Sequence, residues 1–118
     1  MIVGRLTVLA RPWVLSLCKV AASDGVAVVI PAGVVAQVWR HGARQAAIAR
    51  VVGAIGTTVE PLDEEIARLA GRLCRRCGTS DVIDASVVIA ARRHRAVVAS
   101  SDPGDLGRLD LQIEVVSC

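Results

Sequence analysis

The chain has 118 residues and a mass of 12.3 kDa, which is enough for one domain and too little for two. Apolar residues make up 53% of it and charged residues 21%, a balance that supports a packed core and argues against disorder. Trp13 and Trp39 are the only aromatic residues, so we expect an aliphatic core, and the composition argues against proteins that bind single strands by aromatic stacking.

The formal net charge is +3, and thirteen of the fourteen basic residues are arginine. Arginine forms two-point hydrogen bonds with phosphate, so a polyanionic partner is compatible with this composition. A general arginine bias of a GC-rich genome explains the same observation equally well. The charge alone therefore does not identify a partner.

The sequence indicates a cytoplasmic protein without a membrane segment. Its longest run without charge, from Gly25 to Trp39, has 15 residues and is too short for a transmembrane helix. No signal peptide pattern is present, and the four cysteines lack the dense spacing of a disulfide framework. Cys74 and Cys77 form a single CxxC motif, which lacks the further ligands that a zinc site needs.

In the first half of the chain, apolar runs alternate with turn residues. The expected elements are a strand at Ile2–Leu9, a helix from Pro12, a buried strand at Val26–Ile30, helices that follow Pro31 and cover Ala43–Val52, and a strand at Thr57–Glu60. Pro31 is placed in a first helical turn, where proline is tolerated, and Gly42 is expected to break the helix before it. Residues 1–22 fit this alternation least well.

The second half of the chain shows clearer start and stop signals. The expected elements are a helix from Pro61 and Asp63 that ends at Gly78, a helix at Val82–His94, a strand at Ala96–Ser100, a helix at Pro103–Leu109 and a strand at Ile113–Val116. Strands that alternate with helices predict an α/β domain with a parallel sheet.

Four aspartates gather where such a sheet places its ligands, beyond the carboxyl ends of strands. They are Asp81 and Asp84 at the start of one helix, and Asp102 and Asp105 after the strand Ala96–Ser100. Converging carboxylates repel one another unless a cation lies between them, and Mg²⁺ or Mn²⁺ prefers such oxygen ligands. A structural role is the alternative, with Asp81 and Asp102 as helix caps and Asp105 as a first-turn acid favoured by the helix dipole, and for Asp81 and Asp105 it explains the residue at least equally well. Asp84, in contrast, lies within an apolar segment where a carboxylate is costly.

At these residues the sequence resembles the PIN-domain family, and more narrowly the VapC-like toxins of bacterial toxin–antitoxin pairs. The resemblance is carried by the run from Gly78 through Asp84 to Ala91, and by Ala96-Val-Val-Ala-Ser-Ser-Asp102-Pro-Gly-Asp105-Leu106. The segment Ile30-Pro-Ala-Gly-Val-Val-Ala-Gln37-Val-Trp-Arg40 is similar to the second conserved block of that family. The likeness covers roughly residues 26–118.

The resemblance implies one three-layer α/β/α domain with a central, mostly parallel sheet over residues 1–118, of which 1–22 match least. It also implies a Mg²⁺- or Mn²⁺-dependent endoribonuclease, with Asp84 and Asp102 as catalytic metal ligands and Asp81 and Asp105 as auxiliary ones. RNA is the implied substrate, and an antitoxin protein and a second copy of the chain are the implied partners. Val34–Trp39 and Ala43–Val52 are the helical stretches expected to supply a dimer face.

Two of the family's four acidic positions differ in this chain. Family members carry an aspartate in the first strand, whereas this chain has no acidic residue before Asp24 and a loose register places Arg5 there. The second position, often glutamate, is Gln37, whose amide oxygen is a neutral ligand for a hard cation. The alternative hypothesis is therefore a catalytically inactive PIN scaffold that binds an antitoxin or dimerises.

Two groups of basic residues lie near the ends of the helices that carry these candidate ligands. Arg40 follows the helix of Gln37 and is a candidate for contact with an RNA phosphate. The run from Arg92 to Arg95 ends the helix that carries Asp84, where cations complement the helix dipole, so we expect a structural role for it.

Overall fold

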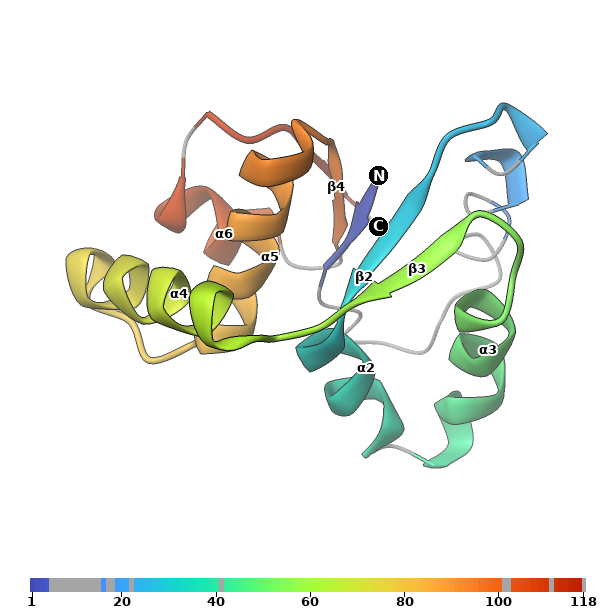
Figure 1. The fold of residues 1–118 in the computed structure, drawn as a ribbon, viewed down its shortest axis with the longest axis horizontal. Helices are drawn as coiled ribbons and strands as arrows, with labels where there is room; N and C mark the ends of the chain where they lie inside the picture. The colour runs from blue at the N-terminus through green and yellow to red at the C-terminus, as the bar shows by residue number, and fades with distance from the viewer. Residues whose placement is uncertain are drawn as a thin grey trace.

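The sheet has five strands, all parallel, in the order β3-β2-β1-β4-β5 (Figure 1). The computed structural model describes residues 1–4, 16, 19–21, 23–40, 42–100, 103–110 and 112–117. The strands are β1 (Ile2–Val3), β2 (Val28–Pro31), β3 (Thr57–Glu60), β4 (Val98–Ser100) and β5 (Val115–Ser117). The expected α/β class with a parallel sheet is confirmed.

Five helices alternate with these strands. They are α2 (Ala32–Trp39), α3 (Gly42–Val52), α4 (Glu64–Cys77), α5 (Val82–His94) and α6 (Pro103–Leu109). The described residues between 16 and 23 are also helical, as expected for a helix from Pro12, but residues 12–15 lie outside the described part. The strand predicted at Ile2–Leu9 is seen at Ile2–Val3, and residues 5–9 are likewise outside it.

The ends of α4 and α5 are fixed by local signals, although α4 begins at Glu64 and not at Pro61 as predicted. Asp63 caps α4, because its Oδ1 accepts a hydrogen bond of 2.9 Å from the backbone N–H of Ile66. Gly78 ends α4 in the left-handed conformation (φ 69°, ψ 31°), which glycine adopts without strain. Asp81 caps α5 in the same way as Asp63 caps α4.

Three strands begin two residues later than predicted, at Val28, Val98 and Val115. The residues before them close the preceding turn instead: the N–H of Val26 donates to the carbonyl of Ala21, and that of Ala96 to the carbonyl of Ala91. The last carbonyls of a helix need such donors, so an apolar run that leaves a helix joins the sheet only after supplying them.

Two of the predicted helix boundaries are also corrected. Pro31 ends β2 and is the N-cap of α2, with φ −58° and ψ 138°, so it stands before the first helical turn rather than within it. Gly42 is the first residue of α3 rather than a break before that helix.

The core lies between the sheet and α5 and is aliphatic, as expected. Helix α5 contacts β1 and β2, and its residues from Asp84 to Ala91 are all buried. The buried hydrophobic residues of the described chain are valine, isoleucine, leucine, alanine and Cys74, while Trp39 is 42% exposed. None of the described helices is long and apolar enough to cross a membrane.

Candidate metal site at the carboxyl edge of the sheet

The strand order reverses between β1 and β4, which are neighbours in the middle of the sheet. From β1 the chain proceeds outward through β2 to β3, whereas from β4 it proceeds the other way to β5. In open parallel sheets, ligands bind beyond the carboxyl ends of the strands at such a reversal. The starts of α2 and α5 lie at this edge, because β2 leads directly into α2 and α5 ends just before β4.

Asp84 occupies the first turn of α5 and is only 2% exposed. Its backbone N–H donates to Oδ1 of Asp81 at 2.9 Å, and the N–H of Asp81 donates to Oγ1 of Thr79 at 3.2 Å. Asp81 therefore performs the capping role that the sequence allowed for it. The cap fixes the first turn of α5 and with it the position of the Asp84 carboxylate.

Helix α2 contacts α5 at this same turn. A Cβ built on Gly33 would lie 3.1 Å from Cγ1 of Ile83, so the two helices approach closely where α5 begins. Gln37 lies one turn beyond Gly33 on the same side of α2. Its Oε1 atom is buried and accepts no hydrogen bond from any residue that the structure describes. The Oδ1 atom of Asp84 is buried in the same way, although Asp84 does have a polar partner.

Cys74 is a neighbour of these carboxylates that sequence reasoning missed. It lies in the last turn of α4, which packs along α5. Burial raises the pKa of its thiol, and the negative charges of Asp81, Cys77 and Asp84 raise it further. Cys74 is thus a neutral thiol beside the carboxylates. The CxxC motif raised only the question of a zinc site, and its spacing did not indicate that Cys74 lies near Asp81 and Asp84.

Ser100 and Gly4 lie side by side at the carboxyl ends of β4 and β1, where both residues are buried. A Cβ added to Gly4 would lie 3.2 Å from Cβ of Ser100 and 3.4 Å from its Oγ. The backbone N–H of Gly4 donates to the carbonyl of Ala99 at 2.8 Å. The end of the first strand is therefore closely packed against β4.

The structure describes the other predicted site residues only in part. Asp102 lies outside the described residues, between the last residue of β4 and the first of α6 in the sequence. Asp105 lies in α6, but its side chain is outside the described part. Arg40 is exposed at the C-cap of α2, away from the α2–α5 contact. Among the described residues, no group of three or more metal-ligating side chains comes together.

Gln37 on α2 and Asp84 on α5, two helices in contact, each carry a buried oxygen of a kind that suits a hard cation. A carboxylate and an amide oxygen are ligands that Mg²⁺ and Mn²⁺ accept, and Mg²⁺ commonly keeps several waters besides one or two carboxylates. The buried Oε1 of Gln37 accepts no hydrogen bond from the described residues. The pair is therefore compatible with part of a metal site, to which residues beyond the described part would add.

Comparison with known proteins does not assign the chain to a family. No family model matches it, and no curated protein matches it significantly.

Proposed function

We propose that this protein is a PIN-like, VapC-related endoribonuclease that depends on Mg²⁺ or Mn²⁺ and acts as the toxin of a toxin–antitoxin pair. One observation carries the proposal. The buried Asp84 carboxylate at the start of α5 and the buried Gln37 oxygen on α2 belong to helices in contact at the carboxyl edge of the sheet. Carboxylate and amide oxygens are ligands that Mg²⁺ and Mn²⁺ accept, which supports a cation at this edge.

In this proposal Asp84 and Asp102 are the catalytic metal ligands, Asp105 and Asp81 contribute through water or substrate, and Gln37 is a neutral ligand. A bound Mg²⁺ or Mn²⁺ supplies an activated water and neutralises charge on the phosphodiester. The chain's own contribution is placement: the Asp81 cap holds the first turn of α5, and the Gly33–Ile83 contact holds α2 against it. Arg40 is proposed to contact an RNA phosphate further along the strand.

We also propose the three-layer arrangement of a PIN domain. Parallel connections are right-handed in nearly all proteins, and the chain moves in opposite directions along the sheet in its two halves. The connecting helices of the two halves are therefore expected on opposite faces. Figure 1, in which α3 lies on one side of the sheet and α5 and α6 on the other, supports this arrangement.

Cleavage of a structured RNA tests the nuclease. The purified protein is incubated with RNA in Mn²⁺ and in EDTA, beside Asp84→Asn, Asp102→Asn and the control Asp24→Asn, which changes an exposed turn residue in the same way. We expect metal-dependent cleavage by the parent and the control, and none by the two site variants. No cleavage by any folded sample would refute the nuclease proposal. Calorimetry with Mn²⁺ would then show whether the protein binds the metal ion without cleaving RNA.

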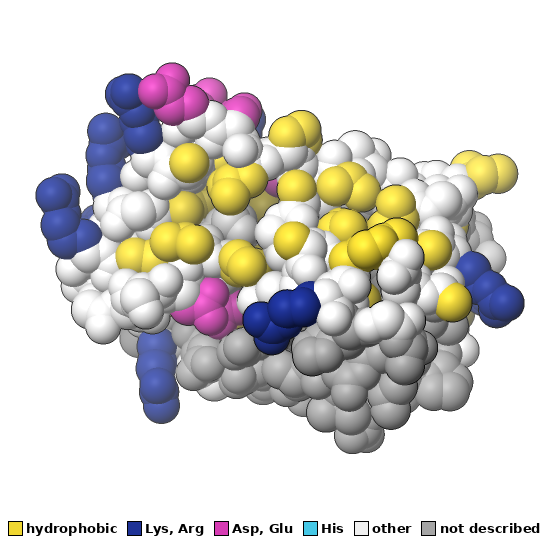
Figure 2. Space-filling view, turned by 90° about the horizontal axis from the view of Figure 1, so that it is seen from below, with side chains coloured by type: hydrophobic (Ala, Val, Ile, Leu, Met, Phe, Trp, Pro, Cys, Tyr) yellow, Lys and Arg dark blue, Asp and Glu magenta, His cyan; other side chains and the backbone are white. Residues whose placement is uncertain are grey.

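A second candidate is an inactive PIN scaffold that binds an antitoxin or a second copy of itself. It is favoured by the lack of an acidic residue before Asp24, which leaves the first strand without the aspartate of the family, and by the neutral Gln37 at the second acidic position. Figure 2 shows hydrophobic side chains gathered on the face seen from below, with arginine and lysine mostly around them. Trp39, Leu62 and Val82 are exposed by 42–49%.

The mass in solution tests dimerisation, the first form of this candidate. A dimer has about twice the chain mass of 12.3 kDa, and Trp39→Ser should return it to the monomer if α2 supplies the contact. A monomeric parent at every concentration would leave only the antitoxin-binding form. Val34 and Val38, which were expected to help form the dimer face, are buried within the chain itself, so Trp39 is the exposed apolar end of that helix.

A further inference from the structure

A groove of about 940 Å³ lies at the opposite end of α5 from Asp84. Its apolar floor includes Val97, Leu109 and Ile113, and its polar wall contains Arg92, Arg95, Arg108, Asp110, Gln112 and Glu114. Arg95 follows Asp84 by eleven residues, which corresponds to about 16 Å along the helix. This groove, called the Arg95 groove below, is thus separate from the carboxyl edge of the sheet. Its lining combines apolar residues with several charged ones, so it suits a ligand that carries both an apolar part and a charged group.

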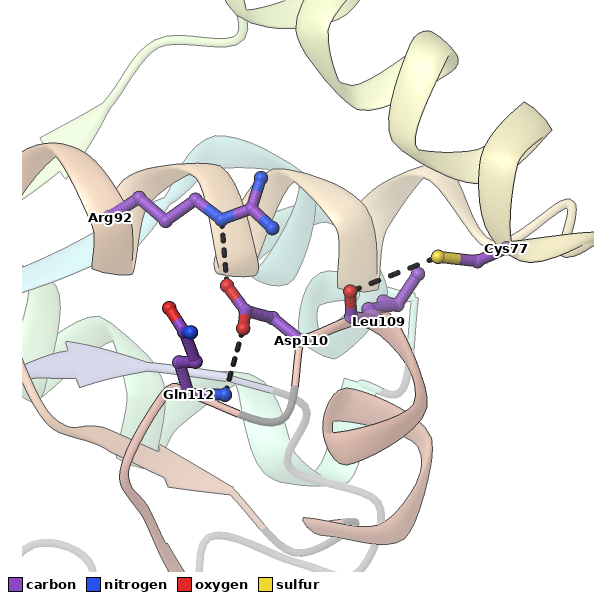
Figure 3. Close-up of polar contacts among 5 residues, drawn as sticks. All are labelled: Cys77, Arg92, Leu109, Asp110 and Gln112. Atoms are coloured by element: carbon purple, nitrogen blue, oxygen red, sulfur yellow. Dashed lines mark hydrogen bonds and ion pairs between the residues drawn. The ribbon is translucent and has the colours of Figure 1, made fainter.

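One arginine of the groove is held in place by an aspartate. Figure 3 shows Arg92 and Asp110 pointing toward each other, with Nε of Arg92 donating to Oδ2 of Asp110 at 2.7 Å. The other oxygen, Oδ1, accepts the backbone N–H of Gln112 at 2.8 Å. These two hydrogen bonds lower the pKa of Asp110, so it stays ionised at neutral pH. The terminal nitrogens of Arg92 make no bond within the described residues, which leaves them available to a ligand.

The end of α6 is fixed on the same wall. The Sγ atom of Cys77 donates to the carbonyl oxygen of Leu109 at 3.8 Å, which links the last residue of α4 to the last residue of α6 (Figure 3). Asp110 follows directly. The pair Arg92–Asp110 is therefore supported from two helices and is a formed feature before any ligand arrives.

A second arginine of the groove, Arg95, adopts a left-handed backbone conformation that is unfavourable for arginine. Arg95 has φ 50° and ψ 48°, and among the described residues it is the single non-glycine with positive φ. It ends α5 as glycine ends α4, with its N–H directed at the carbonyls of Ala91 and Arg92. Glycine would serve the cap with less strain. The guanidinium of Arg95 is exposed and has no hydrogen-bond or ion-pair partner among the residues that the structure describes.

From this geometry we infer that the Arg95 groove binds a nucleoside phosphate, with Arg95 and the free edge of Arg92 on the phosphate. Two guanidinium groups are the donors that phosphate oxygens accept most readily in two-point contacts. Glu114 and Gln112 offer acceptors for sugar hydroxyls, and the apolar floor accommodates the base. A cap preference for cations explains a basic helix end, but it does not explain arginine where glycine fits better. The ligand is either a free nucleotide or one unit of an RNA chain.

The variant Arg95→Gly tests this inference, because it removes the guanidinium and relieves the backbone at once. Binding of 5′-AMP is measured by calorimetry, and binding of a labelled single-stranded RNA of about twelve nucleotides by anisotropy, both in EDTA. We expect Arg95→Gly to bind about tenfold more weakly than the parent, the size of one charge-assisted hydrogen bond. Arg72→Ala, which removes a charge from an exposed position on α4, should bind as the parent does.

The two probes separate the two sources of the ligand. Loss of 5′-AMP binding in Arg95→Gly assigns the groove to a free nucleotide, and loss of RNA binding alone assigns it to a unit of the chain. Equal binding by parent and variant, or no binding of either probe by the parent, overturns the inference. Both probes are measured in EDTA, where a metal-dependent nuclease is inactive, and Asp24→Asn should bind them as the parent does, so failure of the nuclease proposal is distinguishable from failure of this one. If Arg95→Gly folds poorly, Arg95→Asn serves instead, since asparagine also tolerates this conformation.

Asp110 acts as a positioning residue in this inference, and its charge makes the role testable. Asp110→Asn removes a negative charge from the groove, which by simple electrostatics should tighten binding of a phosphate. If Asp110 holds Arg92 in place, the variant instead binds more weakly than the parent. Tighter binding by Asp110→Asn would remove Arg92 from the proposed contact.

Discussion

The cap of α5 offers the sharpest test of how the candidate site is built, because Asp81 can be changed in two ways. Asp81→Ala removes the acceptor of the 2.9 Å hydrogen bond from the Asp84 N–H. Loss of such a cap costs about 1 kcal/mol. For a chain of 118 residues, this lowers the melting temperature by about 4 °C. Asp81→Asn keeps an acceptor in the same place and should lose only a few tenths of a kcal/mol.

Urea unfolding, followed by far-UV circular dichroism, measures both changes. Equal destabilisation by alanine and asparagine would refute the capping argument, because it would show that the charge of Asp81 matters and not its hydrogen bond. The same two proteins separate the cap from a metal ligand. If Asp81 only caps, Asp81→Asn binds Mn²⁺ as the parent does. A large loss of Mn²⁺ affinity at unchanged stability would place Asp81 among the ligands.

Three further predictions concern stability and are measured by chemical or thermal unfolding. Gly78→Ala should lower the free energy of unfolding by about 1 kcal/mol, because Gly78 has a positive φ. Gly71→Ala should raise it by up to about 1 kcal/mol, because Gly71 is exposed inside α4 with open space around it. A change in the same direction for both variants would contradict this reasoning. Leu106→Ala empties a fully buried position and should cost about 3 kcal/mol; a loss below about 1 kcal/mol would show that α6 is not packed as described. The lowered pKa of Asp110 adds stability above the unfolded value of about 4, which is lost as the pH falls further, so Asp110→Asn should differ from the parent most at neutral pH and least in acid.

The sequence predicted those parts of the fold that depend on neighbouring residues. Helices α5 and α6 have the predicted bounds, as has β3, and Gly78 and Asp81 occupy their expected places at helix ends. Each of these depends on a hydrogen bond or a backbone angle within a few residues. The predicted starts of β2, β4 and β5 were wrong, and for β2 and β4 the reason is that the preceding turn uses backbone N–H groups of the predicted strand.

The candidate site was predictable only in part for a related reason. The burial of Asp84 follows from the apolar segment around it, and the sequence indicated it correctly. The contact between Gly33 and Ile83 and the packing of Gly4 on Ser100 join residues 50 and 96 positions apart, and Cys74 approaches the carboxylates from a different helix. No local pattern encodes such contacts, since they arise only when the sheet assembles.

The central strand β1 has a consequence for how the chain reaches its folded state. Ile2 pairs with Val29 on one side and with Val98 on the other, so the earliest segment of the chain joins its two halves. Pairing across such a sequence separation closes a long loop and slows folding. During synthesis, β1 leaves the ribosome before β2 and can pair with it, but the sheet stays open until residue 98 has emerged. The edge of β1 that later pairs with β4 is therefore exposed for most of translation. During that time this edge must not pair with strands of other chains.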